Sequence, residues 1–243
     1  MPDYRIRVGS HTDQGRRSNN EDRFVARSNF FLVADGMGGQ EFGERASGMA
    51  AELIPQLVRE RLAQNDDPAA AVKFALDETN RRIIDAGQQQ PAGRRMGTTA
   101  VLALQHQDQL YIAGLGDSRA YLIRHGEVKQ LTVDHTVAEA LVRNGALTRE
   151  QAEASPWKNV LYKFLGCVEM NEEAEVTPLV PEVGDRLILA CDGITNFVHE
   201  PDYLEGASRF ADPQQWAEEL VKTALARGSK DNLTCVVVFF DSL

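Results

Sequence analysis

Apolar and polar residues follow short-period patterns along most of the chain, and these patterns predict a protein rich in β-strands. Residues 5–12 alternate polar and apolar side chains, as a half-exposed strand does. The other predicted strands are largely apolar runs at residues 23–27, 30–34, 97–104, 110–115, 118–123, 128–131, 185–191 and 231–240. Turn-forming pairs such as His125-Gly126 separate several of these runs.

Helical spacing of apolar residues predicts helices at 44–62 and 213–226. Pro55 lies inside the first pattern and is expected to kink or split that helix. Another helix is expected to begin at Pro68, because Asp67 can cap it and proline suits a first helical turn. Its predicted buried stripe consists of Val72, Ala75, Leu76, Thr79 and Ile83.

These elements predict an α+β layered sandwich, because long β segments are combined with two early helices and a late one and lack a regular βαβ alternation. The 243 residues fit a single domain over 1–243, since we find neither a Pro/Ser-rich linker nor an internal repeat. Residues 134–166 show no clear strand pattern, and we expect them to form an excursion over the core.

The formal net charge of -10 argues against a nucleic-acid-binding protein, which usually has a basic face. No apolar run approaches the length of a membrane span, and the first residues lack the apolar segment of a signal peptide. The three cysteines are far apart and lack zinc spacing, so we interpret them as small core or near-core residues of a protein in a reducing compartment. We therefore expect a cytoplasmic protein that binds neither membranes nor nucleic acids.

The most informative stretch is the apolar run that ends at Asp35 and is followed by Gly36, Gly38 and Gly39. Alone, an Asp-Gly pair is a common turn signal. The arrangement recurs, however, because acids also stand at the ends of other predicted strands: Asp117, Asp192 and Asp231, with the pair Glu21-Asp22 directly before a strand. If the sheets bring one edge together, these carboxylates converge and need cations to offset their repulsion. Oxygen ligands favour Mg²⁺ or Mn²⁺ over zinc or copper.

Six motifs occur in a recognisable order along the chain: Arg17-Ser-Asn-Asn-Glu21-Asp22, Val33-Ala-Asp35-Gly36-Met-Gly-Gly39, Gly97-Thr-Thr-Ala100, Gly116-Asp117-Ser-Arg119, Cys191-Asp192-Gly193 and Lys230-Asp231-Asn232. Together they closely resemble the protein phosphatase 2C-like (PPM) metal-dependent serine/threonine phosphatases in their compact bacterial form. The resemblance runs from about Arg5 to Phe240. It implies a central antiparallel β-sandwich flanked by helix pairs (four layers, α-β-β-α), with a two-metal centre at one edge.

The resemblance also implies a role for each matching residue. Asp35 would bridge two Mn²⁺ or Mg²⁺ ions, and the Gly36 carbonyl would bind one of them. Asp192 and Asp231 would complete the first metal, and Glu21 would serve the second, directly or through water.

Three further roles follow from the same resemblance. Asp22 would be a supporting acid, Asp117 with Asp192 matches the position of a third, weaker metal, and Arg17 matches the arginine that holds the substrate phosphate. The implied reaction is hydrolysis of phosphoserine and phosphothreonine by a water or hydroxide that the two metals share. The implied partners are phosphorylated proteins, namely a bacterial Ser/Thr kinase and its substrates. We expect a monomer.

Some positions depart from the family pattern. Met37 stands where eukaryotic members have a histidine that can act as general acid, and Asn196 replaces an aspartate of many relatives. Residues 134–166 resemble the family's flap beside the active site, although its His-Pro and Leu-Thr-Arg elements are changed here. Tyr162 and Lys163 are candidates for contact with a phosphoprotein or, equally, packing residues.

Two alternatives differ in class. The first is a catalytically silent phosphoprotein-binding regulatory module on the same fold, which would have no need for Asp35, Asp192, Asp231 and Arg17 together. The second is a phosphatase of the haloacid dehalogenase superfamily. We reject it because that chemistry requires an Asp-x-Asp pair, and Asp35-Gly-Met lacks the second acid.

Overall fold

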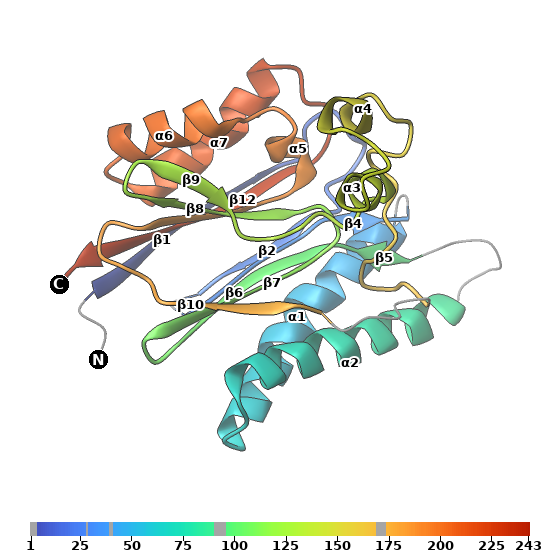
Figure 1. Cartoon of the computed structure of the whole chain (residues 1–243). Helices are drawn as coiled ribbons and strands as arrows, with labels where there is room; N and C mark the ends of the chain where they lie inside the picture. Colours follow the sequence, from blue (N-terminus) through green and yellow to red (C-terminus); the bar gives the residue numbers. More distant parts are fainter. Residues whose placement is uncertain (1–3, 28, 39–40, 90–95, 169–173) are drawn as a thin grey trace.

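In the computed structural model, which describes residues 4–27, 29–38, 41–89, 96–168 and 174–243, two five-stranded antiparallel sheets are stacked face to face (Figure 1). The first sheet has the order β1 (Tyr4–Asp13), β12 (Leu233–Ser242), β11 (Arg186–Ala190), β8 (Arg119–Arg124) and β9 (Glu127–Gln130). The second has the order β10 (Val176–Leu179), β7 (Gln109–Leu115), β6 (Ala100–His106), β3 (Phe30–Ala34) and β2 (Arg23–Ala26). A short pair, β4 (Gly36–Met37) with β5 (Gly97–Thr98), extends beyond the second sheet.

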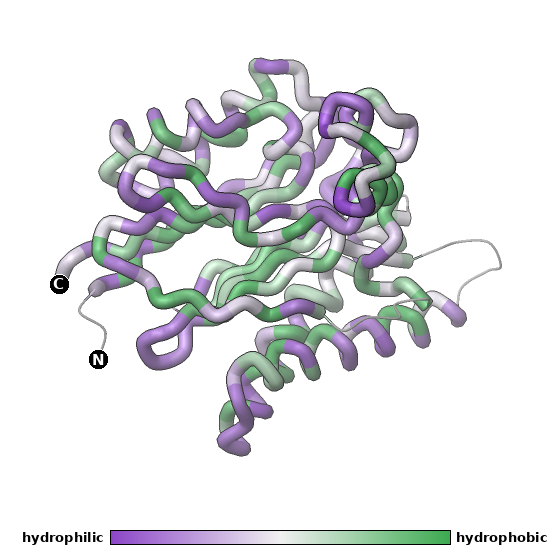
Figure 2. Tube along the Cα trace, viewed as in Figure 1, coloured by the Kyte–Doolittle hydropathy of each residue, from purple (hydrophilic) through white to green (hydrophobic). Residues whose placement is uncertain are grey.

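Helices cover the outer face of each sheet (Figure 1). The second sheet packs on α1 (Glu41–Ala63) and α2 (Pro68–Gln88), and the first on α6 (Glu200–Arg209) and α7 (Pro213–Ala226). The predicted sandwich with four layers is therefore confirmed. Figure 2 shows hydrophobic residues along the central strands and many hydrophilic ones along the outward side of α2.

The central strands are apolar at successive positions because both of their faces are buried. In β3, Phe31 and Val33 pack between the two sheets, whereas Leu32 packs toward α1 and α2. In β12, Val236 packs between the sheets and Val237 toward α6 and α7. A continuous apolar run in this sequence thus corresponds to a strand in the middle of the sandwich.

Two helix predictions had different outcomes. The α2 helix begins at Pro68, with the Asp67 side chain accepting a hydrogen bond from the Ala70 N–H at 2.9 Å, and all five residues of its predicted stripe are buried. Of the two effects expected of Pro55, a kink or a split of the first helix, the split is ruled out, because α1 continues through Pro55 from residue 41 to 63.

The structure differs from the predicted elements at three places, two in strands and one in a helix. The predicted strand 97–104 is broken at Thr99, since residues 97–98 pair with β4 instead of the main sheet. We did not predict β10, an edge strand that contains Pro178 and is only partly buried, or α6, which contains Pro201 and Gly206. The edge strand β10 carries no strong apolar period, so its placement depends on neighbouring elements.

Residues 134–166 contain α3 (Val137–Arg143) and α4 (Arg149–Glu153), which lie beside the end of the sandwich in Figure 1. Single β-bridges, between Thr136 and Leu161 and between Thr98 and Leu165, tie this segment together and to the core. Within the described ranges, no helix is both long and apolar enough to cross a membrane.

Candidate active site

A cavity of about 570 Å³ opens at one end of the sandwich, where the predicted acids meet. Its lining includes seven of the eight predicted site residues: Arg17, Glu21, Asp35, Gly36, Asp117, Asp192 and Asp231. The eighth, Asp22, does not line the cavity, because its side chain is buried next to Asp35 and Cys191. Acids separated by almost the whole chain therefore converge as the strand-end pattern predicted.

Asp35 follows the last residue of β3 and is held in place by two threonines. The Thr99 N–H donates to the Asp35 carbonyl at 2.9 Å, and the Asp35 N–H donates to Thr99 Oγ1 at 3.0 Å. The Thr98 hydroxyl donates to the same carbonyl at 2.8 Å. The Gly97-Thr-Thr motif therefore fixes the backbone that carries Asp35, and Asp35 is one of the residues that line the cavity.

Asp117 lies in the turn between β7 and β8, where Gly116 has a φ of +100° that favours glycine. The backbone N–H of Gly116 donates to the ring nitrogen Nδ1 of His135 at 3.1 Å, and the backbone N–H of His135 donates to the Gly116 carbonyl at 2.9 Å. On the other side of Asp117, Arg119 forms an ion pair with Asp134 at 2.6 Å. The first residues of the 134–166 segment thus hold both sides of the Asp117 turn, a role for His135 that the sequence did not reveal.

Asp231 and Glu21 are brought together by Asn232. The Asn232 side chain accepts a hydrogen bond from the Glu21 N–H at 2.9 Å and donates to the carbonyls of Gln14 and Asn19 at 2.9 Å each. This amide therefore connects the polar loop before β2 to the start of β12. Asn232, the third residue of the Lys-Asp-Asn motif, therefore positions the backbone of Glu21 relative to Asp231, the charged residue of the same motif.

Glycines leave room for Glu21. A Cβ at Gly43 would lie 1.9 Å from Glu21 Oε2, and a Cβ at Gly36 would lie 2.5 Å from the Glu21 carbonyl oxygen. Both distances are far inside van der Waals contact, so larger residues at either position would displace Glu21. The Gly39 position of the same motif lies outside the described residues.

Arg17 stands at the rim of the cavity, with a side chain that is 60% exposed. Its Nη2 donates to Asp231 Oδ2 at 2.6 Å, and this hydrogen bond is the main reason that the pKa of Arg17 is raised. The guanidinium is therefore paired with one of the clustered acids.

The acids strongly disfavour one another's ionisation. Burial raises the pKa of Asp117 to about 7 and that of Asp22 to about 6, and nearby carboxylates, Asp192 among them, add to both shifts. Burial, together with the charges of Asp22 and Asp192, also holds the pKa of Asp35 well above its usual range. Such a cluster is stable in its ionised form only when cations neutralise it.

The donor set fits hard cations. Among the described residues, neither carboxylate oxygen of Asp22 has a hydrogen-bond partner, and ligand atoms of Asp22, Asp35 and Cys191 lie within 4.8 Å of one another. Burial and the nearby acids raise the pKa of the Cys191 thiol well above its usual range, so it stays protonated and is a poor ligand. The remaining donors are oxygens, which Mg²⁺ and Mn²⁺ prefer.

Comparison with known proteins decides the family. Residues 6–141 and 170–233 match the sequence profile described as Protein phosphatase 2C. This chain belongs to the protein phosphatase 2C family. The internal stretch that this profile leaves unmatched, residues 142–169, includes α4 and the part of the 134–166 segment that lines the cavity.

Bacterial members of the protein phosphatase 2C family are similar over most of the chain. "Serine/threonine phosphatase stp" of Listeria monocytogenes is 34% identical over 93% of this chain and 93% of its own length. "Protein phosphatase PhpP" of Streptococcus pneumoniae is 35% identical over 93% of this chain and 94% of its own. A crystal structure of the Mycobacterium tuberculosis phosphatase PstP/Ppp matches with a TM-score of 0.85 at 31% identity, covering 97% of this chain and 99% of that one. The PstP catalytic domain, in a structure described as a complex with two manganese ions, matches with a TM-score of 0.83 at 30% identity, over 98% and 100%.

The structure also locates the positions that depart from the protein phosphatase 2C pattern. Met37 lines the cavity beside Asp35 and offers no proton. Asn196 donates a long hydrogen bond, 3.4 Å, to Asp192 Oδ2. Of the two suggested contact residues, Tyr162 is 41% exposed, whereas Lys163 is buried at 6% and therefore cannot present its side chain to a partner.

Proposed function

We propose that this serine/threonine protein phosphatase of the protein phosphatase 2C family uses two Mn²⁺ or Mg²⁺ ions to hydrolyse phosphoserine and phosphothreonine in proteins. The observation that carries the proposal is the convergence of carboxylates from distant parts of the chain on one cavity with an arginine at its rim. A cluster of buried carboxylates that repel one another has no structural benefit without cations, because burial and repulsion raise the pKa of several of these acids at once.

Each residue has a proposed task. Asp35 would hold both ions, and the Gly36 carbonyl would bind one of them. Asp192 and Asp231 would complete the first ion, and Glu21 would serve the second, directly or through water. Such ions, when bound, supply Lewis-acid activation of water and neutralise charge on the phosphate. A nucleophilic side chain is then unnecessary, which agrees with a protonated, buried Cys191. A third, weaker ion at Asp117 is part of the proposal.

Arg17 would bind the substrate phosphate. Its present partner, Asp231, is also a proposed metal ligand, so a cation that neutralises Asp231 would release the guanidinium for the phosphate oxygens. An arginine suits this task because its planar fork of N–H groups matches two phosphate oxygens at once.

The proposed cellular setting is reversal of a bacterial Ser/Thr kinase, with a monomeric single domain over residues 1–243 and residues 134–166 as the flap. A silent phosphoprotein-binding module is the less favoured function. Such a module requires an arginine for the phosphate, but it has no use for a full set of converging carboxylates that destabilise one another.

The test is hydrolysis of a phosphothreonine peptide with and without Mn²⁺, by the wild type and by Asp192→Ala and Asp231→Ala. We expect turnover that depends on Mn²⁺ and falls by roughly a thousandfold in both variants, because each loses several kcal/mol of metal-dependent stabilisation. Asp108→Ala, at an exposed turn between β6 and β7, is the control and should retain full activity. A folded wild type that binds Mn²⁺ but leaves the peptide intact would refute the proposal.

A further inference from the structure

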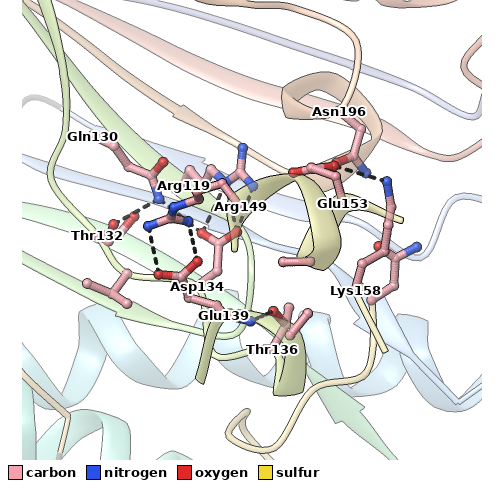
Figure 3. Close-up of a pocket in the computed structure, with 14 residues that line it drawn as sticks. Arg119, Gln130, Thr132, Asp134, Thr136, Glu139, Arg149, Glu153, Lys158 and Asn196 are labelled. Atoms are coloured by element: carbon pink, nitrogen blue, oxygen red, sulfur yellow. Dashed lines mark hydrogen bonds and ion pairs between the residues drawn. The ribbon is translucent and has the colours of Figure 1, made fainter. Parts of the chain in front are cut away.

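Figure 3 shows residues that line a second cavity, of about 420 Å³. This cavity shares a lining residue with the catalytic cavity. Residues of β9, α3 and α4 form part of its wall. Asn159 lines both cavities, and Asn196, in the wall of the second, donates its hydrogen bond to Asp192 in the wall of the first. The two cavities therefore meet at Asn159, at the end of the catalytic cavity that faces the 134–166 segment.

The second cavity has many charged groups but little net charge. Its charged lining residues form three ion pairs: Arg119 with Asp134, Arg149 with Glu139, and Lys158 with Glu153. In Figure 3, dashed lines mark these three ion pairs between residues that line the cavity. Because each cationic side chain is already paired with a carboxylate, the lining attracts neither strongly cationic nor strongly anionic ligands. It offers polar contacts instead.

Asn159 is the side chain best placed to make such contacts. It belongs to an exposed run, residues 156–160, and makes no hydrogen bond within the part of the chain that the structure describes. Its amide has two donors and two acceptor sites, which match the N–H and C=O groups of an extended peptide. Trp157, in the same run, is 51% exposed and offers an apolar surface beside them.

We propose that the second cavity binds the peptide segment on one side of the phosphorylated residue, with Asn159 hydrogen-bonded to the substrate backbone at the junction. The inference rests on the proposed phosphatase function. The partner it fits is an extended, flexible segment of a phosphoprotein with polar, uncharged residues next to the phosphoserine or phosphothreonine. The volume, above the lower end of the range for ligand pockets, accommodates such a segment.

The experiment compares kcat/KM for a phosphothreonine peptide, for the same peptide truncated on either side, and for p-nitrophenyl phosphate, all with Mn²⁺. We expect truncation on one side, and not on the other, to lower kcat/KM about tenfold, the effect of losing one or two hydrogen bonds. Asn159→Ala should lower the ratio of peptide to p-nitrophenyl phosphate activity by about the same factor, and the side-specific effect of truncation should disappear.

A second variant pair tests the cavity itself. Val133 lines the second cavity and is 40% exposed, so Val133→Trp narrows the cavity without entering the core. Val183, 55% exposed and outside both cavities, provides the matched control Val183→Trp. We expect the activity ratio to fall in the first variant and to stay unchanged in the second, with thermal unfolding confirming that both are folded.

The outcomes separate the two proposals. A wild type that hydrolyses p-nitrophenyl phosphate with Mn²⁺ but responds equally to truncation on both sides, or on neither, retains the proposed function and overturns the subsite. An unchanged activity ratio in both Asn159→Ala and Val133→Trp overturns it as well. A wild type inert toward every substrate in the presence of Mn²⁺ overturns the proposed function, and the subsite falls with it.

Discussion

Replacement of Asp117 by asparagine should stabilise the metal-free protein while it impairs the site. Burial, with the nearby charges of Asp192 and Asp134, raises the pKa of Asp117 to about 7 in the folded chain, against roughly 4 in an unfolded one. The native state therefore holds a proton that the unfolded state releases. Stability must fall as pH rises from about 4 to about 7, and the loss is complete above the folded-state pKa.

The magnitude follows from the shift. At about 1.4 kcal/mol per pH unit, the raised pKa of Asp117 costs the metal-free protein up to about 4 kcal/mol at pH 8, where the buried carboxylate is ionised. At pH 5, where the folded protein must keep this carboxyl protonated, the cost is about 1.5 kcal/mol. Asparagine keeps the shape and removes the charge. The gain in unfolding free energy of Asp117→Asn should therefore be larger by about 2.5 kcal/mol at pH 8 than at pH 5. For a chain of this size, 4 kcal/mol corresponds to a rise in Tm of roughly 10 °C.

The assay is chemical or thermal unfolding of both proteins in EDTA across this pH range, repeated with saturating Mn²⁺. Asp108→Asn, at an exposed turn, is the control and should show no pH-dependent gain. Mn²⁺ should reduce the advantage of Asp117→Asn, since cations offset the same repulsion. A gain of equal size at pH 5 and pH 8, or a metal-free variant less stable than the wild type at pH 8, would show that Asp117 is not held in an unfavourable charged state.

Three other substitutions test the construction of the site. Gly43→Ala places a methyl group against the Glu21 carboxylate, so we expect about tenfold weaker Mn²⁺ binding, measured as the loss of Mn²⁺-dependent thermal stabilisation. His135→Leu removes the acceptor for the Gly116 N–H and should lower the unfolding free energy by about 1–3 kcal/mol. His135→Asn should recover most of this loss, because the asparagine Oδ1 can accept the hydrogen bond in place of Nδ1. Equal losses in the two variants would contradict this role of His135. Arg17→Lys should lower kcat/KM for a phosphopeptide at least tenfold, because an ammonium cannot bind two phosphate oxygens in the manner of a guanidinium, and an unchanged value would exclude Arg17 as the phosphate ligand.

The sequence by itself determined the central strands and the identity of the reactive groups. The continuous apolar run of β3 and the alternation in β1 are local signals, because a strand buried on both faces and a half-exposed strand differ in their own residues. The acids at strand ends were likewise visible, since an apolar run that stops at Asp35 or Asp192 can be read without knowing its neighbours. Burial of the α2 stripe followed from its period of 3.6 residues.

Only the tertiary structure decided how these groups act together. The link between Glu21 and Asn232 spans 211 positions, and the hold of His135 on Gly116 depends on how the 134–166 segment folds back over the sandwich. The burial of Asp22 and Lys163 and the second cavity beside Asn159 likewise depend on elements that meet in space. The physical reason is that a residue's pattern reports its own exposure, whereas the pKa of an acid and the shape of a cavity depend on neighbours that close packing brings from elsewhere in the chain.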